Sequence, residues 1–333
     1  MNIVMNTQLS TPGPIKSKTY KQNIKVFFEP SKLFLAQITE LYDDVWPTVT
    51  AIQYFREKVV DYCKTKNVKD NSALVEEFAK SKDKSNRPNL ARFCILDTME
   101  EIKLGIARNL LINLFAYYEA WEEEMLVVLK YSNKTKKSTI KPFQFPSNSK
   151  AKNYYKFLPS IQKHGCQDLI DAFYALYTNG NYSLLDNWLK YYRYFKELRN
   201  CIVHRGSQAS IELMGAYNDI KTLIPKDLIV KELPTISVIT VNDPISYTLR
   251  DVVWFSQILI NLVITFDAEL IKCDHADEYF CQEIANVYTK KKKLPNNDID
   301  KTKLVRSLSG KAFFKKPTDE MKIYNLLIVN GVL

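Results

Sequence analysis

An arginine and a histidine in the middle of the chain are the residue types that an RNA-cleaving site needs. Arg199 and His204 lie in the segment FKELRNCIVHRGSQAS, residues 195–210, and Asn200 follows the arginine. A guanidinium can bind a phosphate and stabilise the charge that develops on it, and an imidazole can move a proton. Because the ribose 2′-hydroxyl can act as the nucleophile, this chemistry requires neither a metal ion nor a protein nucleophile.

The five-residue separation of this pair constrains how it can work. On an ideal helix Arg199 and His204 point about 140° apart, whereas Asn200 and His204 share a face. The two side chains converge more easily where the helix ends, near Gly206, or where two copies of the motif meet across a two-fold axis. The motif is weak on its own. The alternative is that His204 is an interior histidine whose hydrogen bonds are satisfied within the fold.

The elements around this motif are predicted to be helices. Apolar residues recur at helical spacing from Ser31 to Tyr62, where we expect amphipathic helices broken near Pro47, and a weak helix is indicated around residues 74–78. A further predicted helix runs from a cap at Asp97 or Thr98 to about Lys130, and another from Ile161 to Tyr177. A third runs from Ser183 to about His204, where Gly206 ends it, and a fourth from a Thr248–Asp251 capping box to about Cys273. The β-branched pattern between Leu228 and Val241 predicts a small β-hairpin.

Composition favours a helical protein with a basic surface. Only 8 of 333 residues are glycine, 46% are hydrophobic and the formal net charge is +10, so we expect long helices and a surface that attracts phosphates. The six cysteines are scattered without a Cys-x-x-Cys pair, which is typical of reduced thiols in a cytoplasm. The N-terminus has no cationic start followed by an apolar run, which argues against export. The apolar run 252–266 is shorter than a membrane span and predicts a buried core helix.

Three segments together resemble the HEPN superfamily of ribonucleases, which is found in toxin modules, antiviral defence systems and CRISPR effectors. These segments are LRNCIVHRG, the earlier ARNLLINLFAYYEAW, which is similar to the first core helix of the family, and ISYTLRDVVWFSQILINLVITFDAEL, which looks like its last core helix. The resemblance covers residues 98–273. It implies an all-α HEPN-like bundle at 91–275. Outside this bundle, composition and periodicity predict a loose N-terminus at 1–24, an N-terminal helical region at 25–90 and a basic C-terminal extension at 276–333. The Pro- and Lys-rich insertion 131–152 departs from the compact family domain.

The resemblance also assigns roles to residues. Arg199 and His204 match the catalytic pair of the family, Asn200 its polar residue and Glu119 the acidic residue of the first helix. It implies a homodimeric, metal-independent endoribonuclease that needs no cofactor and leaves 2′,3′-cyclic phosphate and 5′-hydroxyl ends. Its setting would be a cytoplasmic toxin or antiviral system, with a regulatory or antitoxin protein as a possible partner and no membrane. We also predict RNA contacts at the cations Arg205, Arg108, Lys290, Lys291, Lys292 and Lys293.

Several alternatives stay open at the level of sequence. Glu119 shares a helix stripe with Arg108, so its carboxylate either orients Arg199 or His204 or forms a structural pair with Arg108. Cys273, His275 and Cys281 fit no common zinc spacing, and phosphate-binding glycine loops are absent. The rival to a ribonuclease is a non-catalytic helical module that binds nucleic acid or a partner protein.

Overall fold

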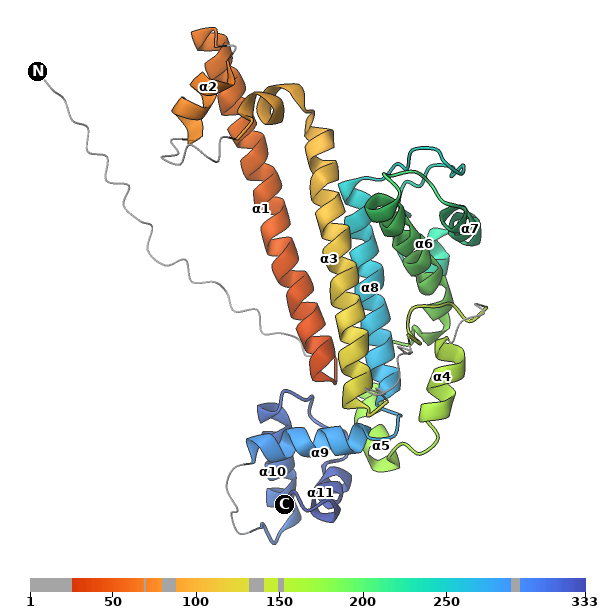
Figure 1. Ribbon diagram of the computed structural model, residues 1–333. Helices are drawn as coiled ribbons and strands as arrows, with labels where there is room; N and C mark the ends of the chain where they lie inside the picture. Colours follow the sequence, from red (N-terminus) through yellow and green to blue (C-terminus); the bar gives the residue numbers. More distant parts are fainter. Residues whose placement is uncertain (1–25, 69, 80–87, 132–140, 149–152, 289–293) are drawn as a thin grey trace, which may run out of the picture.

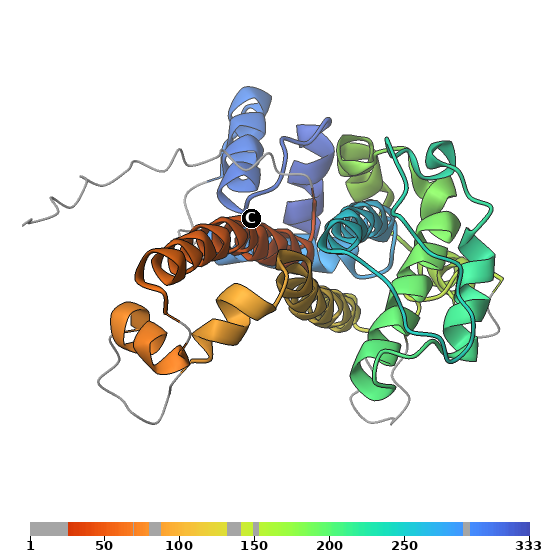
Figure 2. The same ribbon diagram turned by 90° about the horizontal axis from the view of Figure 1, so that it is seen from above.

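Three long helices form the central layer of the protein. The computed structural model describes residues 26–68, 70–79, 88–131, 141–148, 153–288 and 294–333. Helices α1 (Glu29–Lys66), α3 (Met99–Val128) and α8 (Leu249–Leu270) run side by side in Figure 1 and remain neighbours when the molecule is seen from above in Figure 2. The predicted all-α class is therefore confirmed.

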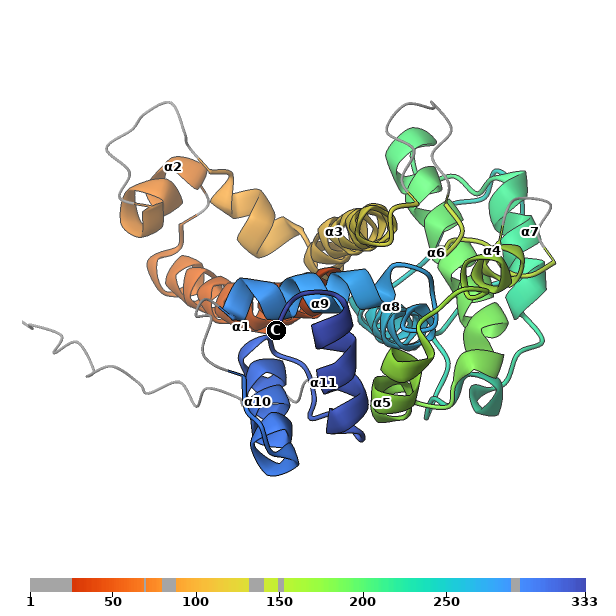
Figure 3. The ribbon, with the colours of Figure 1, turned by 90° about the horizontal axis from the view of Figure 1, so that it is seen from below.

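The remaining helices cover two sides of this layer. Helix α6 (Leu185–His204) packs against α8 and α3, and α7 (Ile211–Ile220) packs against α6 (Figure 1). At the lower end, α9 (Ala276–Val287) crosses beneath α1 and α8, as seen in Figure 3. The other elements of the body are α4 (Tyr154–Ile161), α5 (Gln167–Tyr177), η3 (Tyr182–Leu184), η4 (Pro225–Leu228), α10 (Asp298–Lys311) and α11 (Glu320–Val329).

One hydrophobic core joins nearly all of these elements. It extends from Phe27 and Phe28, just before α1, to Leu327 in α11, so the regions 25–90 and 276–333 both contribute to the core that surrounds α3, α6 and α8. The entry to α1 is fixed by Asp267 of α8, whose carboxylate accepts hydrogen bonds from the backbone N–H groups of Phe27 (2.5 Å) and Phe28 (3.1 Å). These two hydrogen bonds hold the start of α1 against α8 in the central layer.

A small separate cluster closes the far end of α1. It consists of Val59, Leu74, Leu90 and Cys94. These residues come from α1, α2 (Asn71–Leu74) and the neighbourhood of the π-helical turn η2 (Arg92–Leu96); a second π-helical turn, η1 (Val75–Ala79), continues α2. The guanidinium of Arg56 donates to the carbonyl oxygens of Phe93 and Asp97, and so holds the end of η2 against α1.

Capping residues set the starts of the two longest core helices after α1. Thr98 accepts a hydrogen bond from Glu101 N at the start of α3, and Thr248 does the same with Asp251 N at the start of α8, both as complete capping boxes. Helix α8 is long and apolar enough to span a membrane by length and composition, yet 61% of its most apolar window is buried inside the fold. The interpretation of this segment as a buried core helix fits this burial.

The predicted hairpin at 228–241 is wrong. The whole segment is described and contains no strand, and the one isolated bridge nearby joins Gln208 to Pro244. The backbone of this segment bonds to side chains of α8 instead of to a neighbouring strand. Thr235 N donates to Asp251 Oδ1, and the carbonyl of Glu232 accepts from the Trp254 indole. The backbone pairing that does form is non-local, between residues 207–209 and 242–245.

Two helix boundaries also differ from the prediction. The expected helix Ile161–Tyr177 begins six residues later, at Gln167 in α5, and Ile161 is instead the last residue of α4. In the turn between them Gly165 lies so close to the carbonyl of Lys272 that a Cβ there would stand 2.1 Å from its oxygen. Helix α1 is not broken near Pro47 but continues through it. The predicted loose segment 1–24 and the lysines 290–293 lie outside the described residues.

Candidate active site on helix α6

Helix α6 presents Arg199 and His204 from a well-anchored scaffold. Its inner face carries nine buried residues: Leu185, Trp188, Leu189, Tyr191, Tyr192, Tyr194, Phe195, Leu198 and Cys201. The helix ends at His204, because Gly206 (φ 58°) and Ser207 (φ 66°) adopt left-handed backbone conformations and turn the chain away. The predicted helix and its glycine terminator are both confirmed.

Glu119 on α3 contacts Arg199 rather than Arg108. Its Oε1 lies 3.4 Å from Arg199 Nη2, and its Oε2 lies 3.9 Å from Lys141 Nζ. The guanidinium carbon of Arg199 is also 5.3 Å from the centre of the Phe115 ring, within cation–π range. The structure therefore brings together two of the predicted catalytic residues, and the alternative pairing of Glu119 with Arg108 is not formed.

A second carboxylate–lysine network lies one helical turn away, and the sequence analysis did not find it. Glu122 is buried, and its carboxylate accepts hydrogen bonds from Phe143 N (3.0 Å) and Gln144 Nε2 (2.5 Å). Lys196 donates to Gln144 Oε1 at 2.6 Å, so the amide of Gln144 links the lysine to Glu122. The spacing of Glu119 with Glu122 on α3, and of Lys196 with Arg199 on α6, is i,i+3 in both helices, which is a signal present in the sequence.

Burial changes the protonation of this network. It raises the pKa of Glu122 to about 7. The hydrogen bonds from Phe143 and Gln144, and the charges of Lys141 and Lys196, lower this pKa and so oppose the effect of burial only in part. Burial also lowers the pKa of Lys196, while the neighbouring Glu119 carboxylate opposes this effect. Arg199, Lys196 and Lys141 lie around two carboxyl groups, Glu119 and Glu122. Because burial leaves Glu122 only partly ionised near neutral pH, the group keeps a net positive charge that can attract a phosphate.

His204 lies apart from this cluster. Its side chain is exposed, and none of the hydrogen bonds or ion pairs found among the described residues involves its ring. Because α6 stays helical through both positions, Arg199 and His204 leave the helix in different directions, about 140° apart. Asn200 donates to Glu197 Oε2 at 3.2 Å on the same helix. A single chain thus offers Arg199 with Glu119 as one group and His204 as a separate one.

The predicted RNA contacts fall in different places. Arg205 is exposed directly after His204. The pKa of the Glu212 carboxyl group is lowered by its hydrogen bonds to its own backbone and to Ser210, and to a smaller extent by the charge of Arg205. Arg108 is exposed on α3, beside Tyr247. Residues Lys290 to Lys293 lie outside the described part of the chain.

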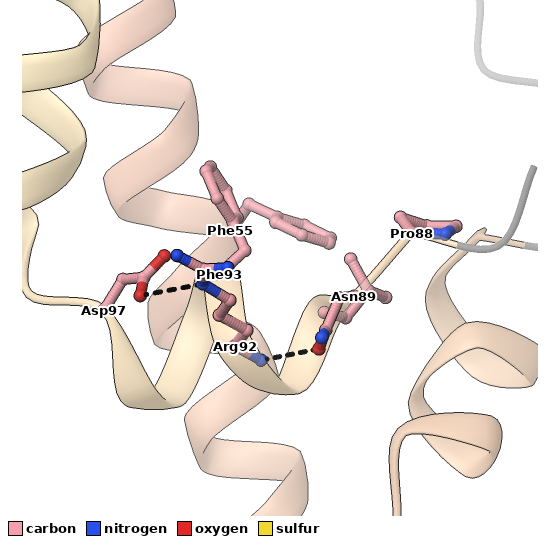
Figure 4. Close-up of a pocket in the computed structure, with 7 residues that line it drawn as sticks. Phe55, Pro88, Asn89, Arg92, Phe93 and Asp97 are labelled. Carbon is pink, nitrogen blue, oxygen red and sulfur yellow. Dashed lines mark hydrogen bonds and ion pairs between the residues drawn. The ribbon is translucent and has the colours of Figure 1, made fainter. Parts of the chain in front are cut away.

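Two cavities of the described structure lie away from Arg199 and His204. One, of about 440 Å³, is at the tip near η2 and is shown in Figure 4, where Phe55 and Phe93 lie close to the Arg92–Asp97 ion pair. The other, of about 520 Å³, is bounded by α6, α8 and residues 229–232. Within the described ranges no group of three or more His, Cys, Asp or Glu side chains is placed to hold a metal ion; His275 instead contacts Glu278 at 3.0 Å.

Comparison of the chain with protein-family models, with curated proteins and with solved structures finds no significant match.

Proposed function

We propose that this chain is a metal-independent endoribonuclease of the HEPN type. The observation that supports this most directly is the arrangement on α6. Arg199 is held by Glu119 within a group of cations, and His204 is exposed at the end of the same helix. The resemblance of the three segments named above supplies the reaction class, and the excess positive charge around Glu119 suits a phosphodiester substrate.

In the proposed reaction the ribose 2′-oxygen attacks the adjacent phosphorus and the bond to the 5′-oxygen breaks. The 2′-hydroxyl proton is removed and a proton is delivered to the departing 5′-oxygen, so the products are a 2′,3′-cyclic phosphate and a 5′-hydroxyl. Arg199 stabilises the negative charge that builds on the phosphoryl oxygens. His204 moves one of the two protons, since imidazole changes its charge near neutral pH. Glu119 orients Arg199, and Asn200 and Arg205 lie beside the pair.

The setting of this activity follows from the same resemblance. We propose that the enzyme acts in the cytoplasm in a toxin or antiviral defence system and is restrained there by a regulatory or antitoxin protein.

The test is cleavage of total RNA by purified protein in excess chelator, with mapping of the end groups. His204→Ala should lower the rate by about 10²- to 10⁴-fold, the usual contribution of a general acid or base. His164→Ala is the matched control, because His164 is also exposed but lies before α5, outside the α6 motif. Unchanged cleavage in folded His204→Ala, or a requirement for added magnesium or zinc, would refute the proposed mechanism.

The second candidate is a non-catalytic module that binds nucleic acid. The ion pair of Arg199 with Glu119 favours it, because a guanidinium with 22% of its side chain exposed and a carboxylate partner can serve packing alone. In that case RNA binds with the same affinity to the wild type and to His204→Ala, and no cleavage products form in either sample.

A further inference from the structure

The cavity between α6 and α8 has the construction of a small-molecule site rather than of a surface irregularity. Its volume of about 520 Å³ lies within the range of ligand pockets, and it combines indole and aliphatic walls with a few polar side chains. It is lined by Asn181, Trp188, Ile229, Val230, Lys231, Glu232, Trp254, Gln257 and Asn261. None of these residues belongs to the proposed catalytic group.

The aromatic part of the cavity is held rigidly. Trp254 Nε1 donates to the carbonyl of Glu232 at 2.9 Å, and the Tyr191 ring packs 4.9 Å from the Trp254 ring. Trp188, which is fully buried, donates from Nε1 to the carbonyl of Leu228 at 3.2 Å. Trp254 remains partly exposed to the cavity, so it is a fixed platform on which a flat ring can stack without a cost for ordering the indole.

The polar part offers one acceptor and one donor on adjacent turns of α8. Gln257 Nε2 donates to Asn261 Oδ1 at 3.1 Å, which orients both amides. Among the described residues, Gln257 Oε1 and Asn261 Nδ2 have no other hydrogen-bond partner. Adenine presents a donor at N6 and an acceptor at N7, which matches this arrangement, whereas guanine presents two acceptors along the corresponding edge.

The charge at the rim favours an anion. Lys231 is exposed and has no ion pair within the described structure, while the carboxylate of the next residue, Glu232, is paired with Arg250. The local excess is therefore one positive charge, which suits a phosphate on the ligand and disfavours a neutral sugar as the main occupant.

The backbone beside this cation is strained. Ile229 adopts a left-handed conformation (φ 51°, ψ 48°), which is an outlier for a β-branched side chain, and its side chain is 68% exposed. Strain of this kind persists where the surrounding structure fixes it, and Ile229 is held as the C-cap of η4, where Val230 N donates to the carbonyl of Pro225 at 3.2 Å. Here it turns residues 230–232 back toward α8, so that Lys231 and the Glu232 carbonyl lie at the cavity.

We propose that this cavity binds an adenine nucleotide, either as a free mononucleotide or as one unpaired base of an RNA strand. The base stacks on Trp254, its N6/N7 edge meets Gln257 and Asn261, and its phosphate lies near Lys231. This site goes beyond the proposed ribonuclease activity and does not depend on it, because it uses no residue of the Arg199–Glu119 cluster and not His204.

The experiment is isothermal titration of the full-length protein with AMP, GMP, CMP and UMP. AMP should bind, and GMP and UMP should bind at least about tenfold more weakly, the discrimination expected of one good amide–base pairing. Trp254→Leu and Gln257→Ala should each weaken AMP binding about tenfold or more. The matched controls, Trp46→Leu and Gln53→Ala, should leave it unchanged, because both residues are exposed on α1, which contributes no side chain to the cavity lining.

Short oligoadenylate and oligouridylate distinguish the two sources of the base. If the site serves an RNA strand, oligoadenylate binds more tightly than AMP, and Gln257→Ala removes its advantage over oligouridylate. If the ligand is a free nucleotide, AMP binds at least as tightly as either oligomer. No AMP binding up to about 1 mM, equal binding of all four nucleotides, or undiminished AMP binding in folded Gln257→Ala would overturn the proposal. AMP binding by His204→Ala separates this result from any failure of the ribonuclease proposal.

Discussion

Two buried carboxyl groups hold key parts of the chain in place. Asp267 accepts hydrogen bonds from the backbone N–H groups of Phe27 and Phe28 before α1. Glu122 accepts them from the backbone N–H of Phe143 and the side-chain amide of Gln144 beside α6. Burial raises the pKa of both groups to about 7, and in each case the hydrogen bonds and nearby lysines only partly oppose this effect. In the unfolded chain the carboxyl group of Asp267 has its ordinary pKa of 3.8 and that of Glu122 its ordinary pKa of 4.5.

These shifts predict how stability changes with pH. Since the folded pKa is the higher one, the folded state binds more protons than the unfolded state between about pH 4.5 and 7, and stability falls as pH rises through that window. We expect the free energy of unfolding to increase by about 3 kcal/mol in total when the pH is lowered from 8 to 6. Denaturant unfolding at fixed ionic strength measures this change.

The slope should become smaller in Asp267→Asn and Glu122→Gln, even if each substitution changes the stability at pH 8. A free energy of unfolding that decreases steadily from pH 8 to pH 6 would contradict the assignment.

In the candidate site, the sequence predicts which residues share a helix but not which side chains of different helices contact each other. The motif placed Arg199, Asn200 and His204 on one helix, and the stripe on the first core helix placed Glu119 on a face shared with apolar residues. The contacts of Arg199 with Glu119 and of Gln144 with Lys196 depend on how α3, α6 and residues 141–148 pack together. Periodicity within one helix carries no information on which helix lies opposite, so the Glu122 network had no counterpart in the prediction.

At the scale of elements, helices with local signals were predicted well. The Thr248–Asp251 box marks the start of α8 and Gly206 ends α6, because capping and left-handed backbone conformations are properties of a few adjacent residues. The hairpin at 228–241 failed for the opposite reason. A β-branched pattern predicts an extended chain, but whether a partner strand pairs with it is decided elsewhere, and here the side chain of Asp251 takes the place of one.

Helix α1 gives a test at this scale, because it continues through Pro47. A proline inside a helix removes one backbone hydrogen bond and crowds the preceding turn. Since Pro47 is exposed, its replacement removes no core packing. Pro47→Ala should therefore raise the free energy of unfolding by about 1–2 kcal/mol, after allowance for the greater freedom of the unfolded chain.

The control for this substitution is Thr48→Ala at the next exposed position, which should change stability by less than about 0.5 kcal/mol. Thermal or denaturant unfolding compares the two variants. A Pro47→Ala protein that is less stable than the wild type would show instead that the proline sets a bend on which the packing of α1 against α3 depends.

At the scale of the whole molecule, the surface around the end of α6 combines charged groups with exposed apolar groups. Val203 is 48% exposed beside His204, and Ile211 is 63% exposed at the start of α7. Arg205 lies between them in the chain. A contact with a second chain would bury these two apolar side chains.

Arg199 and His204 point in different directions from one helix, so we expect a second copy of the chain to bind at this surface and complete the pair. Two α6 ends related by a two-fold axis bring an arginine of one chain near a histidine of the other, which a single regular helix does not do. We therefore predict a homodimer that buries Val203 and Ile211. Pairing also doubles the positive charge near the scissile phosphate, so RNA binding by the dimer should depend more steeply on salt than binding by a monomeric variant.

Light scattering across a dilution series, measured beside RNA cleavage, tests this prediction. Val203→Asp should shift the protein to a monomer and lower the specific activity in parallel, because a charge at the two-fold contact meets its own copy. Val329→Asp is the matched control, since Val329 is 84% exposed at the end of α11, which packs on α5 and α10, and it should leave both properties unchanged. A wild-type protein that is monomeric at every concentration and keeps its full specific activity would exclude the composite site, and would require Arg199 and His204 of one chain to act together on the surface of α6.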